Sequence, residues 1–364
     1  MDFRLLHCKS RRQKRKLFKF TKKVYRGITA YKSGFSQILK MMLKKRGSFC
    51  ENCLLIDPVV VEQKGEIVAA CIYIVAKNYP AVCQIGFFEA IEGVQDAVDL
   101  LVEEAYKISR ERGIKKIIIG VNGHMSYGIG ILANSYNNPP VFGGTYNPPY
   151  YLSYFTKYAT EEFLLNCYQG KIKDSEIQLV KYQRIIQRVN RNFSFRTSDF
   201  TQLKNEIKIY SAISSKCFMD HPLYFPTTFE EDYELFKSLS LFINGECLII
   251  AEKEGVPIGY ILWYPDINEL VPNGGTLGVA TYIKNKLFPH RIKRIIIAEI
   301  AVLPEYQGGG VILALFHKAI QYVKNKYTDY ESGWIFSSNF KSDHLATTFT
   351  KELCRQHKVL ELIV

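Results

Sequence analysis

The sequence lacks any apolar run close to the roughly 20 residues that a membrane-spanning helix needs. It also lacks the composition of a disordered chain, since 47% of its residues are hydrophobic and 23% are charged. No apolar segment follows the basic amino-terminal stretch, so we expect no secretory signal. Membrane-embedded, disordered and secreted classes are therefore disfavoured, and we expect a globular protein of the cytoplasm.

The nine cysteines lack the spacing of a disulfide framework, which suits a reducing compartment. The pair Cys50-x-x-Cys53 has no second pair elsewhere, so two incidental thiols are favoured over a zinc or redox site. The remaining candidate metal ligands are histidines that show no HExxH or similar spacing. They are His124, His221, His290, His317 and His344. We therefore expect no metal cofactor.

Acidic residues are almost missing from the first 48 positions, which contain 16 Lys and Arg but only one acid. The rest of the chain is nearly balanced, so this segment accounts for the net charge of +13. A solvated basic surface is the favoured interpretation of residues 4–46, and contact with an anionic partner such as nucleic acid is the alternative. No RNA- or DNA-binding signature accompanies the charge.

A length of 364 residues exceeds the usual size of a single hydrophobic core, so two domains are expected. A strand–strand–helix–strand order occurs twice, at a period near 200 residues. The segments are 67–75, 83–91, 94–112 and 114–121 in the first half, and 258–264, 292–302, 311–323 and 333–337 in the second. We predict an α/β protein of two similar lobes, 1–175 and 176–364, each a mixed twisted sheet flanked by helices.

The second half contains the most informative stretch. An apolar strand ends at Pro304, and Gln307-Gly308-Gly309-Gly310 leads into a helix that begins at Val311. A strand, a glycine turn and a helix direct unpaired backbone N–H groups at an anion, and glycines allow a phosphate to approach closely.

This stretch resembles the acyl-CoA-binding motif of the GNAT (Gcn5-related N-acetyltransferase) superfamily, V-x-P-x-x-(Q/R)-x-x-G-x-(G/A). Val302, Pro304, Gln307 and Gly310 match that motif, whereas Ile312 replaces its last small residue. The order of elements, with Gly86-Phe87-Phe88-Glu89 and Tyr146-Asn147-Pro148-Pro149-Tyr150-Tyr151 in the first lobe, resembles tandem-GNAT proteins.

The resemblance implies an N-acyltransferase that uses acetyl-CoA or another acyl-CoA and a small-molecule or peptide amine. The amides of Gly308, Gly309, Gly310 and Val311 would hold the diphosphate, and Ile300 and Val302 would pair with the pantetheine. Glu299 is the candidate base. Asn339 and Ser342 match the start of a family motif whose tyrosine is replaced by Ala346, which leaves Tyr306 or Cys354 as candidate acids.

The first lobe has Glu89, Glu92 and Asp96 where the second has its glycine turn, so we expect no diphosphate there. The missing acid also suggests an alternative function, a catalytically silent GNAT-fold protein that binds CoA or an acyl chain. Gly310→Glu is predicted to abolish stabilisation by acyl-CoA, and a thiol-release assay separates the enzyme from the silent binder.

Overall fold

The computed structural model describes residues 3–350 and 352–364. The chain divides into two compact units, the first made of Met1–Leu165, Pro272–Leu277 and Arg355–Val364, the second of Asn166–Val271 and Gly278–Cys354. This division differs from the predicted 1–175 and 176–364, because the final strand pairs Leu360–Ile363 with Lys116–Ile119 of the first unit. Among the described residues, no helix combines the length and apolar character that crossing a bilayer requires.

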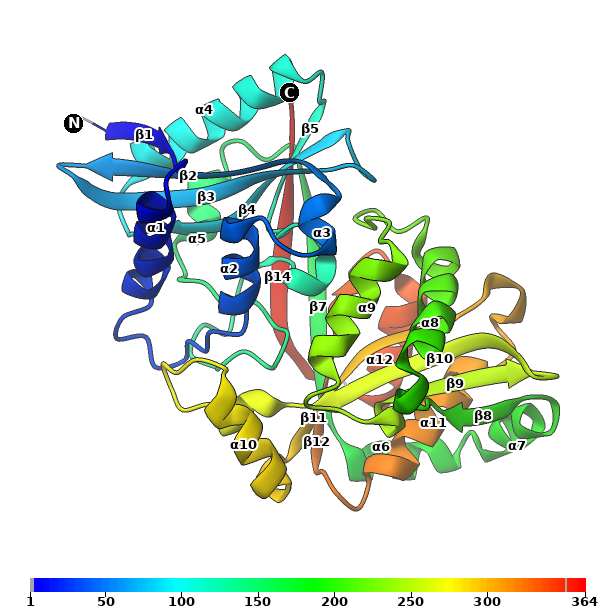
Figure 1. The fold of residues 1–364 in the computed structure, drawn as a ribbon. Helices are drawn as coiled ribbons and strands as arrows, with labels where there is room; N and C mark the ends of the chain where they lie inside the picture. Colours follow the sequence, from blue (N-terminus) through cyan, green and yellow to red (C-terminus); the bar gives the residue numbers. More distant parts are fainter. Residues whose placement is uncertain (1–2, 351) are drawn as a thin grey trace. The chain divides into compact units, whose positions relative to one another are not determined.

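The first unit is a mixed sheet with helices on both faces (Figure 1). Its helices are α1 (Arg11–Val24), α2 (Ser36–Lys44), α3 (Ser48–Glu51), α4 (Gln95–Glu111) and α5 (Tyr151–Phe155). Its strands are β1 (Phe3–His7), β2 (Cys53–Gln63), β3 (Glu66–Ala76), β4 (Val82–Ala90), β5 (Lys116–Ile119) and β6 (Ile131–Leu132). Strands β7 (Glu161–Lys171) and β14 (Glu352–Ile363) contribute residues to both units.

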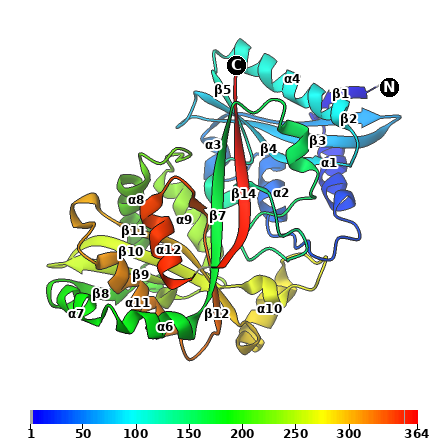
Figure 2. The same ribbon diagram turned by 180° about the vertical axis from the view of Figure 1, so that it is seen from behind.

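The second unit repeats this plan, with the strand order β7-β12-β11-β10-β9-β8. Its helices are α6 (Ile172–Val180), α7 (Gln183–Asn192), α8 (Leu203–Phe218), α9 (Phe229–Leu239), α10 (Val279–Leu287), α11 (Val311–Val323) and α12 (Phe340–Phe349). Its strands are β8 (Ser194–Thr197), β9 (Leu248–Lys253), β10 (Val256–Pro265), β11 (Arg294–Val302), β12 (Asp329–Ser332) and β13 (Ile335–Phe336). Helices α6, α7 and α11 lie along one face of this sheet, and Figure 2 shows them from behind.

Local sequence signals account for several of these boundaries. Ser10 caps α1 and Thr228 caps α9 through reciprocal hydrogen bonds with the third helical residue. Gly113, with φ +66°, follows α4 where a left-handed residue ends a helix. In each unit a strand, a helix and a parallel strand follow one another, because β4 pairs with β5 and β11 with β12 in parallel.

The strand that pairs in parallel with β11 lies earlier in the sequence than predicted. It is β12, and the predicted range 333–337 contains only the two-residue β13. The prediction followed the apolar Trp334–Phe336 segment and passed over the more polar Asp-Tyr-Glu-Ser of β12. The N–H of Gly333 makes a further hydrogen bond to β11, to the carbonyl oxygen of Ile297 at 2.7 Å, and a Cβ at Gly333 would lie 2.5 Å from the carbonyl oxygen of Ala298.

Candidate functional site

The glycine turn lies between the end of β11 and the start of α11. A short 3₁₀ turn, η6 (Pro304–Tyr306), follows the strand, and Gln307 then closes the connection with its side chain. Gln307 Nε2 donates to the carbonyl oxygen of Val302 at 3.0 Å. The glutamine thus braces the turn, and the carbonyl oxygen of Val302 already accepts a hydrogen bond.

Gly308 and Gly309 leave open space beside the backbone. An added Cβ at Gly308 would meet nothing within 4 Å, and at Gly309 it would meet only the carbonyl oxygen of Tyr306 at 3.7 Å. The N–H groups of residues 308–313 donate no hydrogen bond to any residue that the structure describes. The start of α11 therefore presents unpaired donors at an exposed turn.

Gly310 is required by both backbone conformation and packing. Its φ of +92° lies in the left-handed region, and an added Cβ would lie 2.7 Å from Cγ2 of Ile185 in α7. Helix α7 thus packs directly against the glycine turn. The same helix carries three exposed arginines, Arg184, Arg188 and Arg191.

The backbone of β11 loses a neighbouring strand just before the turn. Strand β12 pairs with Arg294–Ile297 and ends at Ser332, so Ala298–Val302 pair only with β10 among the described residues. A β-bulge at Ala298 opposite Leu262 and Trp263 accompanies this divergence. Ile300 and Val302 therefore lie on a strand segment with one open edge.

Glu299 follows the bulge and faces two buried tyrosine hydroxyls. Tyr210 of α8 and Tyr260 of β10 donate to the same oxygen, Glu299 Oε2, at 2.8 and 2.7 Å. Ser214 Oγ lies 2.7 Å from the Tyr260 hydroxyl and extends the network. Burial raises the pKa of Glu299, and the two tyrosine hydrogen bonds oppose that rise.

A second carboxyl group shares this environment. Asp232 of α9 is buried and accepts a hydrogen bond from Ser211 Oγ at 2.6 Å. Burial raises the pKa of Asp232 to about 6, with the Glu299 charge among the smaller causes. The second unit therefore holds two neighbouring carboxyl groups whose pKa values are raised by burial, and perturbed carboxyl pKa values are common at sites of proton transfer.

The other predicted site residues make different contacts. Tyr306 packs edge-on against Phe193, and Lys253 Nζ lies 5.5 Å from its ring centroid. Asn339 caps α12 by accepting a hydrogen bond from the N–H of Ser342 at 3.2 Å. Cys354 Sγ contacts the carbonyl oxygen of Cys167 at 3.2 Å. None of these contacts joins the hydroxyl network around Glu299.

The corresponding turn of the first unit is covered by tyrosines from α5. The Tyr154 hydroxyl donates to the carbonyl oxygen of Ile91 at 2.5 Å and accepts from the N–H of Val94 at 3.3 Å. The Tyr150 hydroxyl donates to the carbonyl oxygen of Ala90 at 3.0 Å. In the first unit, tyrosine side chains therefore form hydrogen bonds with the backbone groups of the turn. In the second unit, the N–H groups of the corresponding turn form no such bonds with the described residues.

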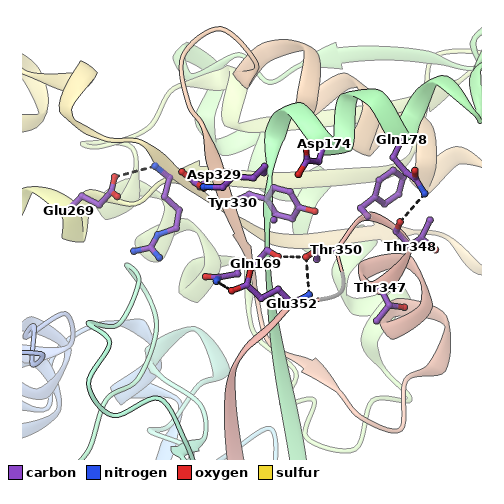
Figure 3. A pocket seen from close by; sticks show the side chains of 14 residues that line it. Gln169, Asp174, Gln178, Glu269, Asp329, Tyr330, Thr347, Thr348, Thr350 and Glu352 are labelled. Carbon is purple, nitrogen blue, oxygen red and sulfur yellow. Dashed lines mark hydrogen bonds and ion pairs between the residues drawn. The ribbon is translucent and has the colours of Figure 1, made fainter.

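A cavity of the second unit lies at the other ends of its strands (Figure 3). Its volume is about 760 Å³, and Arg294 and Asp329, which begin β11 and β12, line it. The glycine turn follows the carboxyl end of β11, roughly 25 Å away along the strand. Several of the cavity's polar side chains contact one another, as in the ion pair of Lys171 with Asp329 and the hydrogen bond that Gln169 donates to Glu352. This cavity is therefore separate from the glycine turn.

The comparisons with known proteins assign the second unit to a family. Residues 209–349, from within α8 to the end of α12, match the model of the Acetyltransferase (GNAT) family. The chain therefore contains a GNAT-family domain, which the second unit carries. No curated protein matches the sequence.

Solved structures extend the likeness to the whole chain. A tandem GNAT protein from the clavulanic acid biosynthesis pathway, without AcCoA, superposes with a TM-score of 0.57 at 10% identity, over 100% of this chain and 98% of that one. A probable N-acyltransferase from Enterococcus faecalis V583 gives 0.55 at 8% identity, over 100% and 73%. The GCN5-related glucosamine N-acetyltransferase region of a fungal GH3 beta-N-acetylglucosaminidase gives 0.56 at 14%, over 99% and 38%. The chain thus has the fold of two tandem GNAT-like lobes.

Sequence reasoning missed the residues that surround Glu299 and the turn. Tyr210, Tyr260 and Asp232 come from three separate elements, and no spacing links them to Glu299 along the chain. The spacing of the arginines in α7 did offer a signal, since positions 184, 188 and 191 recur at helical intervals.

Proposed function

We propose that the second unit transfers an acyl group, most simply acetyl, from a CoA thioester to an amine. The observation that carries this proposal is the set of unpaired N–H groups at residues 308–313. A doubly charged diphosphate is the ligand that such a helix start and its glycines favour. The GNAT-family match of residues 209–349 supports the same reaction class.

We propose specific roles for the residues around this turn. The amides of Gly308 to Val311 hold the diphosphate, and the open edge of β11 at Ile300 and Val302 pairs with the pantetheine amides. The exposed arginines of α7 add positive charge next to the phosphates. Gln307 fixes the turn through its hydrogen bond to Val302.

Glu299 is the proposed general base. The amine nitrogen attacks the thioester carbonyl carbon, its proton passes to the Glu299 carboxylate, and the carbon–sulfur bond breaks to release the thiolate. A raised pKa suits this role, because a base works best when its pKa approaches the working pH. The contacts of Tyr306 and Asn339 favour supporting roles for both, in closing the turn and capping α12.

We propose that the first unit binds no CoA diphosphate at its own turn. The Tyr150 and Tyr154 hydroxyls already bond to that turn, and Glu92 and Asp96 lie exposed beside it. The nine cysteines form no disulfide among the described residues, which suits a reducing compartment such as the cytoplasm. The basic side chains of α1 lie mostly on its exposed surface, where an anionic partner stays a proposal.

Hydrogen exchange on the full chain tests where the cofactor binds. Acetyl-CoA is expected to slow exchange of the amides of residues 308–313, because phosphate oxygens would accept their hydrogen bonds. Exchange at residues 91–96 of the first unit is expected to be unchanged. Protection at the first turn without protection at the second would contradict the assignment.

Glu299→Gln is expected to lower the rate of acyl transfer by roughly 100- to 10,000-fold, the usual contribution of a general base. Binding of acetyl-CoA is expected to be unaffected, since Glu299 lies before the glycine turn. The assay measures thiol release with a panel of amines, and Tyr306→Phe is the matched control, expected to retain activity. Absence of turnover by the wild-type protein despite tight CoA binding would favour the silent acyl-CoA-binding alternative.

A further inference from the structure

The first unit contains a cavity that the proposed acyl transfer does not use. Its volume is about 120 Å³, and it lies where β4 and β5 stop pairing after Ile85 and Ile119. Glu89 of β4 and Asn122, which follows β5, are among its lining residues. This volume is small compared with the pockets of drug-sized ligands, so it suits a molecule of a few heavy atoms.

Glu89 is the carboxyl group of this cavity, and it occupies the same position as Glu299 in the second unit. Each follows a β-bulge in the strand that precedes the helix. The Tyr151 hydroxyl donates to Glu89 Oε2 at 2.6 Å, and the Tyr25 hydroxyl, which lines the same cavity, donates to the carbonyl oxygen of Tyr146 at 3.2 Å. The carboxyl group with two tyrosines is therefore present in both units, although the phosphate-binding turn is not.

The backbone beside Glu89 is strained. Phe87 has a φ of +49°, which is unfavourable for a bulky side chain, and its N–H donates to Asn122 Oδ1 at 2.6 Å. Strain of this kind costs on the order of 1–3 kcal/mol and is concentrated at functional sites. The surrounding contacts hold this conformation next to the cavity.

Aromatic rings form one wall of the cavity. Tyr25 and Tyr31 stack with ring centroids 3.7 Å apart, and Tyr146 lies 6.3 and 6.1 Å from them. All three line the cavity together with Glu89. Aromatic faces and a carboxylate attract the same kind of ligand, a cation.

The solvent side of the cavity is basic. Lys22 is exposed and Lys32 is half-buried, and both line the same space as Glu89. A ligand that carried only positive charge would be repelled by these lysines. A ligand with an anionic group at its other end would be attracted by them.

We propose that this cavity binds a small zwitterionic amino compound, with its ammonium group on Glu89 between the tyrosines and its carboxylate or phosphate near Lys22 and Lys32. The site stands apart from acyl transfer in the second unit and does not depend on it. The charge of the ammonium group compensates for the hydration that the carboxylate of Glu89 loses through burial.

Binding is expected to release a proton. Burial raises the pKa of Glu89 to about 8, so the carboxyl group is mostly protonated at pH 7, and a bound ammonium favours its ionised form. The titratable groups around it are Tyr25, Tyr31, Tyr150, Tyr151, Lys22 and Lys32. The four tyrosines have pKa values raised above 10 and stay neutral, so Glu89 is the group that changes charge.

Calorimetric titration of the full chain tests this site, with 4-aminobutanoate, 3-aminopropyl phosphate, butylamine and butanoate as probes. The two zwitterions are expected to bind at millimolar or lower concentration, butylamine more weakly and butanoate not at all. Titrations at pH 7 in two buffers of different ionisation enthalpy are expected to show close to one proton released per ligand. Failure of both zwitterions to bind the wild-type protein would overturn the proposal.

Two sets of variants locate the site. Glu89→Gln is expected to weaken zwitterion binding at least about tenfold and to abolish proton release, whereas Glu299→Gln, at the equivalent position of the second unit, is expected to leave both unchanged. Should Glu89→Gln fail to fold, Lys22→Ala with Lys32→Ala provides the test. This double variant is expected to weaken the binding of zwitterions without weakening that of butylamine, and binding of zwitterions equal to wild type would overturn the proposal.

Discussion

Gly309→Glu is expected to abolish the thermal stabilisation that acetyl-CoA confers, while changing the free energy of unfolding of the ligand-free protein by about 0.5 kcal/mol or less. Gly309 has no left-handed φ, and its added Cβ would meet nothing closer than 3.7 Å. The substitution therefore introduces a carboxylate at the phosphate site without straining the fold. Repulsion of about 1–4 kcal/mol from a neighbouring phosphate charge corresponds to roughly 5- to 1,000-fold weaker binding.

Gly309→Ala is the matched control for this experiment. It adds a Cβ without charge, so most of the stabilisation by acetyl-CoA is expected to remain. Gly310→Glu, the variant that the motif alone suggests, is less informative, because any side chain at residue 310 meets Ile185 and a φ of +92°. Melting temperatures with and without acetyl-CoA decide the outcome, and full stabilisation of Gly309→Glu would place the diphosphate elsewhere.

The elements that could be predicted from the sequence are those with local signals. Helix α11 spans Val311–Val323 as predicted, because an apolar stretch begins directly after three glycines. Helices α1 and α9 likewise begin directly after Ser10 and Thr228, each of which forms a capping box with the residue three positions on. Their boundaries depend on contacts within one turn of helix, which the sequence encodes directly.

Strand β14 could not be predicted in this way. It carries Arg355, His357 and Glu361, all buried in the first unit, so its sequence lacks the apolar pattern of an interior strand. The carbonyl oxygens of Asn138 and Pro139 accept from Arg355, and Glu361 pairs with Lys116 at 2.8 Å. These partners are distant in sequence, and only the folded chain shows that the charges are compensated.

The candidate site likewise has one part that local sequence predicts and another that depends on contacts between distant segments. The turn at Gly308–Gly310 is a contiguous motif and was predicted from the sequence. The network around Glu299 requires α8, α9 and β10 to pack against β11, and Glu89 acquires its tyrosines from α1 and α5. Sequence reasoning placed Glu89 among repulsive carboxylates, whereas its burial beside tyrosine hydroxyls gives it a raised pKa instead.

Glu89→Gln is expected to raise the free energy of unfolding at pH 9 by about 2 to 4 kcal/mol and to leave it nearly unchanged at pH 4. Burial raises the pKa of Glu89 from 4.5 to about 8 in the folded protein. Between these values the folded state keeps a proton that the unfolded state releases, so wild-type stability falls as the pH rises through this window. Converting the whole pKa difference at about 1.36 kcal/mol per pKa unit would give a larger change in the free energy of unfolding. We expect a smaller change because Glu89 borders a cavity, where solvent screens its charge.

Glutamine keeps the shape of the protonated acid and can accept the Tyr151 hydrogen bond, but it does not titrate. Urea unfolding of the full chain, followed by circular dichroism between pH 4 and pH 9, is therefore expected to give a flatter stability profile for this variant than for the wild-type protein. Glu92→Gln, an exposed position in the neighbouring turn, is the control and is expected to follow the wild-type profile. Parallel profiles for wild type and Glu89→Gln would mean that Glu89 ionises in the folded protein without penalty, because water or a counter-charge then reaches the carboxylate through the cavity.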